Sequence, residues 1–329
     1  MPHLKTVFAT AGIALLVAAC SSAPAATPAD PAVTPKAPTA TTAPRATAPT
    51  TTPPRTAPAL RGPYVALGDS YTAGLGIPEQ TGPVAGCGQS TASYPYLVAR
   101  SLRLTLTDMS CSSATIPDLT TEQATGQGTN PAQLSALAPG TALVTVSIGG
   151  NDIGIIDIVT KCAELDLLPA LIPSGRSSAL TPCENYYTAG GTDQIRQRIE
   201  TMSADLAGAL TEIRARAPRA RVYVVGYPDL LPTRGGGCSD ALGITAGDIA
   251  FLDAEEVRLN EALRAAAAGA GDGYVDTYAP SVGHDACAAP AERWLEPLVS
   301  SGAAAPLHPN AAGERAMADA VLAAVTSAG

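Results

Sequence analysis

Five short apolar runs, separated by segments with helical periodicity, most constrain the fold of this chain. Each run is rich in Val, Ile and Leu and lacks clean alternation, which predicts a strand that is buried on both faces. They cover Tyr64–Gly68, Leu104–Met109, Ala142–Ile148, Arg221–Gly226 and Gly273–Thr277. Strands that alternate with helices predict a parallel sheet covered by helices on both faces. We therefore expect a three-layer α/β/α fold with a five-stranded parallel sheet.

Three segments between and after these runs predict long helices. The clearest covers Asp193–Ala217, where apolar residues at helical spacing form one stripe, and Pro218 ends it. A second covers about residues 247–268. A third begins after Asn310, which is a favourable N-cap residue.

The first part of the chain predicts export and anchoring. Residues 1–19 contain an apolar run that ends in small residues, which is typical of a secretory signal peptide and too short for a stable membrane span. The ending LVAAC resembles a bacterial lipobox, which implies cleavage before Cys20 and lipidation of its thiol. Ordinary secretion with a free Cys20 is the alternative. We expect a secreted, extracytoplasmic protein that is attached to the cell membrane only through lipid on Cys20.

The rest of the chain divides into a linker and one domain. From Cys20 the segment 20–61 is dominated by Ala, Pro and Thr, which predicts a disordered linker. Residues 62–329 are enough for one domain with a full core, which we expect to be monomeric. The net charge of −9, without a cluster of Lys and Arg, argues against nucleic-acid binding.

Polar residues follow the predicted strands, and ligands of such sheets bind at the carboxyl ends of the strands. Ser70 follows the first strand, the segment 110–115 follows the second and the segment 149–152 follows the third. His308 lies beyond the fifth strand, just before the last helix. A hydroxyl, main-chain donors, an amide and an imidazole at one edge form the set that acyl transfer needs. The sequence lacks a Gly-x-Ser-x-Gly elbow, which argues against an α/β-hydrolase. It also lacks a phosphate-binding loop and a dinucleotide fingerprint, and we expect no cofactor.

These residues resemble a known family. GDSYTAG, GGND and a late His-Pro pair, in that order, resemble the SGNH (GDSL) hydrolases, which are serine lipases and esterases. The resemblance spans about residues 63–327 and implies the flavodoxin-like fold of that family. The segments YPYLVARSL, CSSAT, GHDAC and RWLEPL are most similar to secreted, disulfide-bearing actinobacterial lipases and esterases.

The resemblance implies a role for each polar residue at the edge. Ser70 matches the family's nucleophile, and the alternative is a hydroxyl that caps the following helix. We expect Asp69 to brace the turn. The oxyanion hole would consist of the main-chain N–H groups of Ser70 and Ser113 and the side-chain amide of Asn151. The family usually has a glycine where this chain has Ser113, so Ser113 must adopt the backbone conformation of that glycine.

His308 matches the family's general base. The family pattern Asp-x-x-His would place an acid at position 305, where this sequence has Ala305. We therefore expect a Ser–His dyad, with the ring oriented by the main-chain carbonyl of Ala305 or of a residue close to it. Glu296 and Asp285 are the candidates for a displaced third member. Of the other two histidines, His284 is the rival base, and His3 lies in the signal peptide.

Six cysteines remain after Cys20, an even number suited to an oxidising compartment. Metal binding is the alternative, but Cys-x-x-Cys and His spacings are missing, so we expect no metal. Positions in neighbouring loops favour three disulfides, and the resemblance implies the same pairing: Cys87–Cys111, Cys162–Cys183 and Cys238–Cys287.

The sequence thus predicts a lipase or esterase that cleaves carboxylic esters, chiefly of acyl lipids, through an acyl-enzyme on Ser70. The apolar stretch LDLLPALIP, within the insertion of residues 153–191, favours a fatty acyl chain, although a core segment would look the same. One alternative is a carbohydrate esterase that removes acetyl groups from cell-wall glycans with the same residues. The other is a lipoprotein that binds lipids or glycans without turnover.

Overall fold

The computed structural model describes residues 60–167, 180–232, 238, 242–300 and 302–327. The predicted signal peptide, the predicted lipidation site at Cys20 and nearly all of the predicted linker lie outside the described residues. Part of the stretch LDLLPALIP also lies outside them.

The central sheet confirms the predicted architecture. Its five strands are all parallel, in the order β4-β1-β7-β8-β9. They are β1 (Tyr64–Gly68), β4 (Leu106–Asp108), β7 (Leu143–Ser147), β8 (Arg221–Val225) and β9 (Gly273–Val275). Two short antiparallel pairs, which the sequence did not predict, lie outside this sheet: β2 (Gln80–Thr81) with β3 (Gln89–Ser90), and β5 (Gln123–Thr125) with β6 (Gly128–Asn130).

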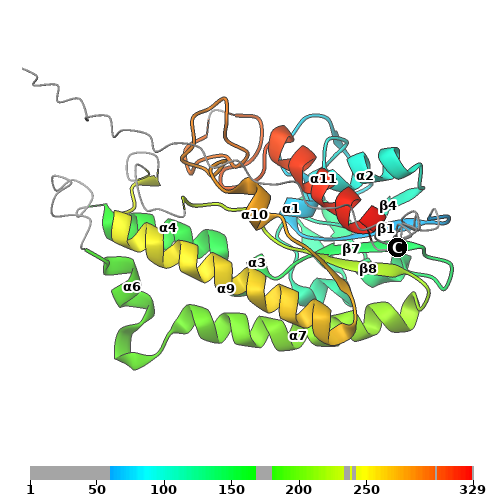
Figure 1. Ribbon diagram of the computed structural model, residues 1–329, viewed down its shortest axis with the longest axis horizontal. Helices are drawn as coiled ribbons and strands as arrows, with labels where there is room; N and C mark the ends of the chain where they lie inside the picture. Colours follow the sequence, from blue (N-terminus) through cyan, green and yellow to red (C-terminus); the bar gives the residue numbers. More distant parts are fainter. Residues whose placement is uncertain (1–59, 168–179, 233–237, 239–241, 301, 328–329) are drawn as a thin grey trace, which may run out of the picture. The chain divides into compact units, whose positions relative to one another are not determined.

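Helices cover both faces of the sheet (Figure 1). The longer ones are α2 (Tyr94–Leu102), α4 (Ile155–Asp166), α7 (Gln194–Arg216), α9 (Ala246–Ala270) and α11 (Ala311–Ser327). The short ones are α1 (Ser70–Ala73), α3 (Gly150–Ile153), α6 (Pro182–Tyr187) and α10 (Tyr278–Ser281). Short 3₁₀ helices are η1 (Ala85–Cys87), η2 (Ile116–Leu119), η3 (Gln133–Ala136) and η5 (Ala189–Gly191). No helix of the described part is both long and apolar enough to cross a membrane.

The three predicted helices form where their caps and apolar stripes place them. The Asp193 carboxylate accepts the Arg196 N–H at 2.9 Å at the start of α7, whose apolar stripe is buried. The side-chain oxygen of Asn310 accepts the Ala312 N–H at 2.9 Å at the start of α11. Such caps satisfy main-chain donors that a helix leaves without partners.

The apolar core lies on both faces of the sheet because neighbouring residues of each strand point to opposite faces. Val65 and Leu67 of β1 belong to the buried cluster that includes α7 and α9. Tyr64 and Ala66 belong to the cluster that includes α2 and α11. This two-faced burial fixes the strands and hence the sheet edge from which Ser70 emerges.

The structure joins the six cysteines in the three pairs that the sequence favours, Cys87–Cys111, Cys162–Cys183 and Cys238–Cys287. The paired residues are 24, 21 and 49 positions apart. Closing such loops restricts the unfolded chain and typically stabilises a fold by about 2–4 kcal/mol for each bond.

Candidate active site

The first turn after β1 presents the Ser70 hydroxyl. Gly68 has φ +150°, and a Cβ there would lie 2.4 Å from the Ser147 carbonyl oxygen of β7, so only glycine fits this close approach. Asp69 caps α1, since its Oδ1 accepts the Tyr71 N–H at 2.9 Å. Ser70 is therefore the first helical residue and not the cap, and the alternative interpretation of its hydroxyl is wrong. Asp69 braces the turn, as expected.

His308 lies against Ser70, although the two are 238 positions apart. Its Nε2 is 2.7 Å from Ser70 Oγ, and its Nδ1 is 2.7 Å from the Pro306 carbonyl oxygen. A carbonyl oxygen only accepts, so Nδ1 carries the hydrogen and Nε2 is free to accept from the Ser70 hydroxyl. Burial lowers the pKa of His308, which keeps the ring neutral and available as a base.

The carbonyl on the ring belongs to Pro306 and not to Ala305 itself, so the orienter is a main-chain carbonyl close to Ala305, as expected, one residue beyond the position named. The Ala305 carbonyl instead accepts the main-chain N–H of His308 at 3.2 Å. The physical reason is the turn between these residues: Leu307 has φ +61°, and the chain there reverses so that the ring reaches the carbonyl two positions earlier.

The two acids considered as a displaced third member bind elsewhere. Glu296 accepts from the Ser300 hydroxyl at 2.5 Å and from the Asn310 amide at 3.2 Å. Asp285 accepts the Cys287 N–H at 2.8 Å. Within the described residues, no carboxylate hydrogen-bonds to the His308 ring. The geometry is that of a dyad with a main-chain orienter.

The rival histidine supports a loop instead. The His284 ring stacks on Trp294, with ring centroids 3.9 Å apart and an interplanar angle of 2°. Its Nδ1 is 2.5 Å from the Glu292 carbonyl oxygen. These contacts hold the segment that leads to His308, so the ring has a supporting role in this loop.

The segments that lead to the other two expected oxyanion donors bond to the turn that carries Ser70: the Cys111 N–H donates to the Gly68 carbonyl at 3.0 Å, and the Asp69 N–H donates to the Ser147 carbonyl at 3.1 Å. Ser113 has φ +63°, so it adopts the left-handed conformation that a glycine adopts freely. In the described part of the chain, the N–H groups of Ser70 and Ser113 donate to no acceptor. The Asn151 amide donates to the Ala114 carbonyl at 2.9 Å, which leaves its second hydrogen free for an oxyanion.

Three side chains that support the site could not be identified from the sequence. The Tyr71 hydroxyl donates to the Leu307 carbonyl at 2.5 Å, and Asp152 accepts the Ile116 N–H at 3.0 Å. Tyr227, which is 4% exposed, lies against Asp69. The only signal in the sequence was the place of Tyr71 and Asp152 within the motifs GDSYTAG and GGND. Tyr227 carries no such signal beyond following a strand.

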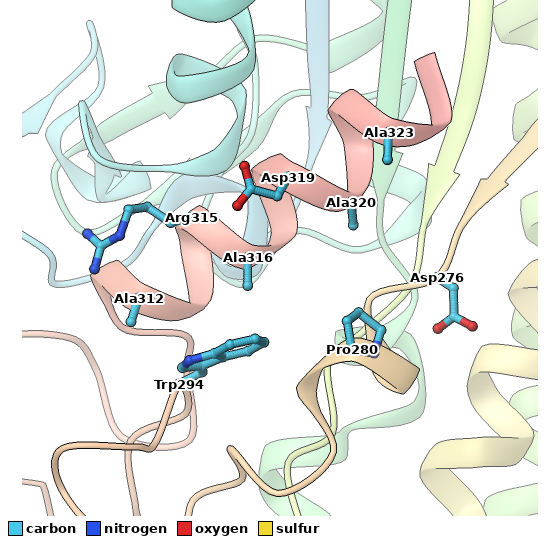
Figure 2. Close-up of a pocket in the computed structure, with 9 residues that line it drawn as sticks. All are labelled: Asp276, Pro280, Trp294, Ala312, Arg315, Ala316, Asp319, Ala320 and Ala323. Carbon is cyan, nitrogen blue, oxygen red and sulfur yellow. The ribbon is translucent and has the colours of Figure 1, made fainter. Parts of the chain in front are cut away.

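A separate hollow of about 610 Å³ lies between α11 and the residues Trp294, Pro280 and Asp276 (Figure 2). Trp294 and Pro280 face a row of alanines along the helix, with charged side chains around them: Asp276, Arg315 and Asp319. The hollow contains none of the expected site residues. Across the described segments, no three His, Cys, Asp or Glu side chains gather as possible metal ligands.

Comparisons with known proteins agree with this geometry. Residues 66–316 match the model of the GDSL-like Lipase/Acylhydrolase family. Over 258 residues the chain is 42% identical to Lipase 2 of Streptomyces coelicolor. The aligned region covers 78% of this chain and 83% of that protein.

Two crystal structures resemble the fold closely. The extracellular lipase of Streptomyces rimosus has a TM-score of 0.64 at 29% identity, covering 80% of this chain and all of that one. The phospholipase A1 of Streptomyces albidoflavus has a TM-score of 0.64 at 27% identity, covering 80% of this chain and 99% of that one.

Proposed function

The chain belongs to the GDSL-like lipase/acylhydrolase family and is a carboxylic ester hydrolase, and we propose that it cleaves acyl-lipid esters through an acyl-enzyme on Ser70. The observation that carries the proposal is the distance of 2.7 Å between Ser70 Oγ and His308 Nε2, with the other ring nitrogen on the Pro306 carbonyl. A nucleophile, a base and an orienting group in hydrogen-bond contact are the parts of an activated serine.

In the first half of the reaction, Ser70 Oγ attacks the ester carbonyl carbon while its proton passes to His308 Nε2. The carbonyl oxygen becomes an oxyanion that accepts from the Ser70 N–H, the Ser113 N–H and the Asn151 amide. The intermediate then collapses, the C–O bond to the alcohol breaks, and His308 returns the proton to the leaving oxygen. The acyl group stays on Ser70.

In the second half, water replaces the alcohol. His308 Nε2 takes a proton from the water as it attacks the acyl carbon, and the proton returns to Ser70 Oγ when the acid leaves. The Pro306 carbonyl keeps the hydrogen on Nδ1 throughout, so Nε2 is always the nitrogen that exchanges a proton. A neutral carbonyl stabilises the imidazolium less than a carboxylate would, because it carries no full charge.

The names of similar proteins support acyl-lipid substrates. The relatives include a lipase at 42% identity, and the similar folds include an extracellular lipase and a phospholipase A1. The three disulfides support an oxidising compartment outside the cytoplasm.

The proposal also includes the membrane anchor at Cys20. Its support is the sequence of the first twenty residues. Replacing Cys20 by Ser is expected to move the protein from the membrane fraction into the medium, and an unchanged membrane fraction would contradict the anchor.

A chain-length series of p-nitrophenyl esters on the purified domain tests the substrate class, with Ser70→Ala as the blank. We expect kcat/KM to rise from acetate to medium or long acyl chains, and Ser70→Ala to remove the activity at every length. Highest activity on acetate and on acetylated glycans would replace the acyl-lipid proposal with the carbohydrate esterase. Hydrolysis by Ser70→Ala near the wild-type rate would reject the nucleophile.

A further inference from the structure

One buried phenol joins two of the three segments that carry the expected oxyanion donors. The Tyr227 hydroxyl donates to Asp69 Oδ2 at 2.5 Å and accepts the Gly150 N–H at 2.8 Å. Tyr227 is 4% exposed and Asp69 is 1% exposed. Asp69 precedes Ser70, and Gly150 precedes Asn151. The phenol therefore bridges the nucleophile turn and the loop of the Asn151 amide.

Tyr227 is itself held from the opposite side. Its N–H donates to Asn260 Oδ1 at 2.8 Å, and the Asn260 amide donates back to the Tyr227 carbonyl at 3.0 Å. Asn260 belongs to α9. The Tyr227 ring also meets the Tyr71 ring edge-on, with centroids 5.1 Å apart. These contacts fix the position of the Tyr227 hydroxyl relative to α9. From that position the hydroxyl holds both the turn that carries Ser70 and the loop that carries Asn151.

The Gly150 side of the bridge needs a close approach. A Cβ at Gly150 would lie 3.0 Å from the Tyr227 ring, tighter than ordinary contact, so glycine lets the phenol reach the main chain. The preceding Gly149 has φ +117°, a conformation that glycine adopts freely, and the Gly150 N–H that follows donates to the phenol. A second contact then locates the Asn151 amide, which donates to the Ala114 carbonyl.

We propose that Tyr227 is a positioning residue that sets the spacing between the Ser70 N–H and the Asn151 amide in the oxyanion hole, acting through Asp69 and Gly150. The inference rests on the proposed function of Ser70 and Asn151. Oxyanion donors act only when they sit at hydrogen-bond distance from the developing charge, so a small displacement weakens the transition state more than the bound ester. A spacing defect therefore lowers kcat and leaves KM nearly unchanged.

The test is Tyr227→Phe, which keeps the ring and removes only the hydroxyl. The matched control is Tyr64→Phe, because Tyr64 is also buried and its hydroxyl shares a hydrogen bond of 2.7 Å with Thr145 of β7. Tyr64 is the first residue of β1, whereas Ser70 follows the last. We expect kcat of Tyr227→Phe to fall roughly ten- to hundredfold, less than the loss of a whole donor, with KM within about twofold. The control should lose stability and keep kcat.

A trifluoromethyl ketone forms a hemiketal oxyanion on the serine, so its inhibition constant reports on the oxyanion hole. A purely structural role of Tyr227 would leave this inhibition constant unchanged. The inhibition constant should rise by the same factor as kcat falls in Tyr227→Phe and should stay constant in Tyr64→Phe. A folded Tyr227→Phe with kcat and inhibition constant within twofold of wild type would overturn the inference.

Two further results separate the possible failures. If Tyr227→Phe does not fold, Asp69→Asn replaces it as the test. The phenol proton then faces an amide hydrogen in place of a carboxylate oxygen, so kcat should again fall at least tenfold. A folded Asp69→Asn with wild-type kcat would overturn the inference. If Ser70→Ala stays active, the proposed function fails as well. An inactive Ser70→Ala beside an unaffected Tyr227→Phe would reject the positioning role alone.

Discussion

Ser70, the proposed nucleophile, and His308, the proposed base, are held in different ways. On the nucleophile side, side chains fasten the loops: Asp69 and Tyr227 bond to each other, and the Asn151 amide bonds to the Ala114 carbonyl. On the base side, the main chain provides most of the contacts. His308 is held through its carbonyl by the Glu296 N–H and through its ring by the Pro306 carbonyl.

This difference shows which parts of the site require a particular side chain and which do not. A carbonyl exists at every position, so the orienter of the base does not require a particular side chain. Ala305 can therefore stand where the family pattern has an acid, because Pro306 supplies the acceptor by its backbone. The nucleophile side has no such freedom, since a carboxylate, a phenol and an amide each provide a contact that another side chain would lose.

The largest effect is expected from His308→Ala, which removes the only side chain on the base side that chemistry requires. We expect kcat to fall roughly 10⁴- to 10⁶-fold, as in other serine hydrolases that lose their base. The matched control is His284→Ala, whose ring stacks on Trp294 and does not reach Ser70, and which should cost less than about tenfold, or about 1.4 kcal/mol. Equal losses in both variants would contradict the assignment of the base.

Asn151→Ala tests the side-chain dependence of the nucleophile side. Loss of one oxyanion donor should lower kcat by about 10²- to 10³-fold with little change in KM. Asn130→Ala is the control, because the Asn130 amide also donates to a carbonyl, that of Met109, but is not one of the expected donors. Steady-state kinetics on one p-nitrophenyl ester would measure both variants. A kcat of Asn151→Ala close to that of the control would remove Asn151 from the hole.

The smallest effects should come from the acids near the base. Glu296→Gln and Asp285→Asn should each lower kcat by less than about tenfold, or about 1.4 kcal/mol of barrier, because neither carboxylate contacts the His308 ring. Circular dichroism would verify that each variant folds. A thousandfold loss in a folded variant would show that an acid completes a triad in solution and would erase the contrast between the two sides.

The same contrast explains what the sequence could predict. Apolar runs and caps predicted the sheet and the three long helices, because burial and capping depend on local residue types. Ser70, Asn151 and His308 could be proposed because the edge of a parallel sheet brings together the residues that follow its strands, and the family resemblance implies a role for each of them.

The rest depended on contacts that no local pattern encodes. The orienting carbonyl is one residue from its predicted place because the left-handed Leu307 decides which carbonyl meets the ring. The bond of Tyr227 to Asp69 joins residues 158 positions apart, and the bond of Tyr71 to Leu307 joins residues 236 positions apart. Neither pair has a spacing that helix or strand periodicity would reveal.

The central claim is that Ser70 is the nucleophile, activated by a histidine that the main chain orients. Labelling with a fluorophosphonate, followed by intact-mass and peptide mass spectrometry, tests it most directly. We expect one adduct per chain, located on Ser70, slow labelling in His308→Ala and near wild-type labelling in Glu296→Gln and Asp285→Asn. An adduct on another residue, or undiminished labelling of Ser70→Ala, would contradict the account.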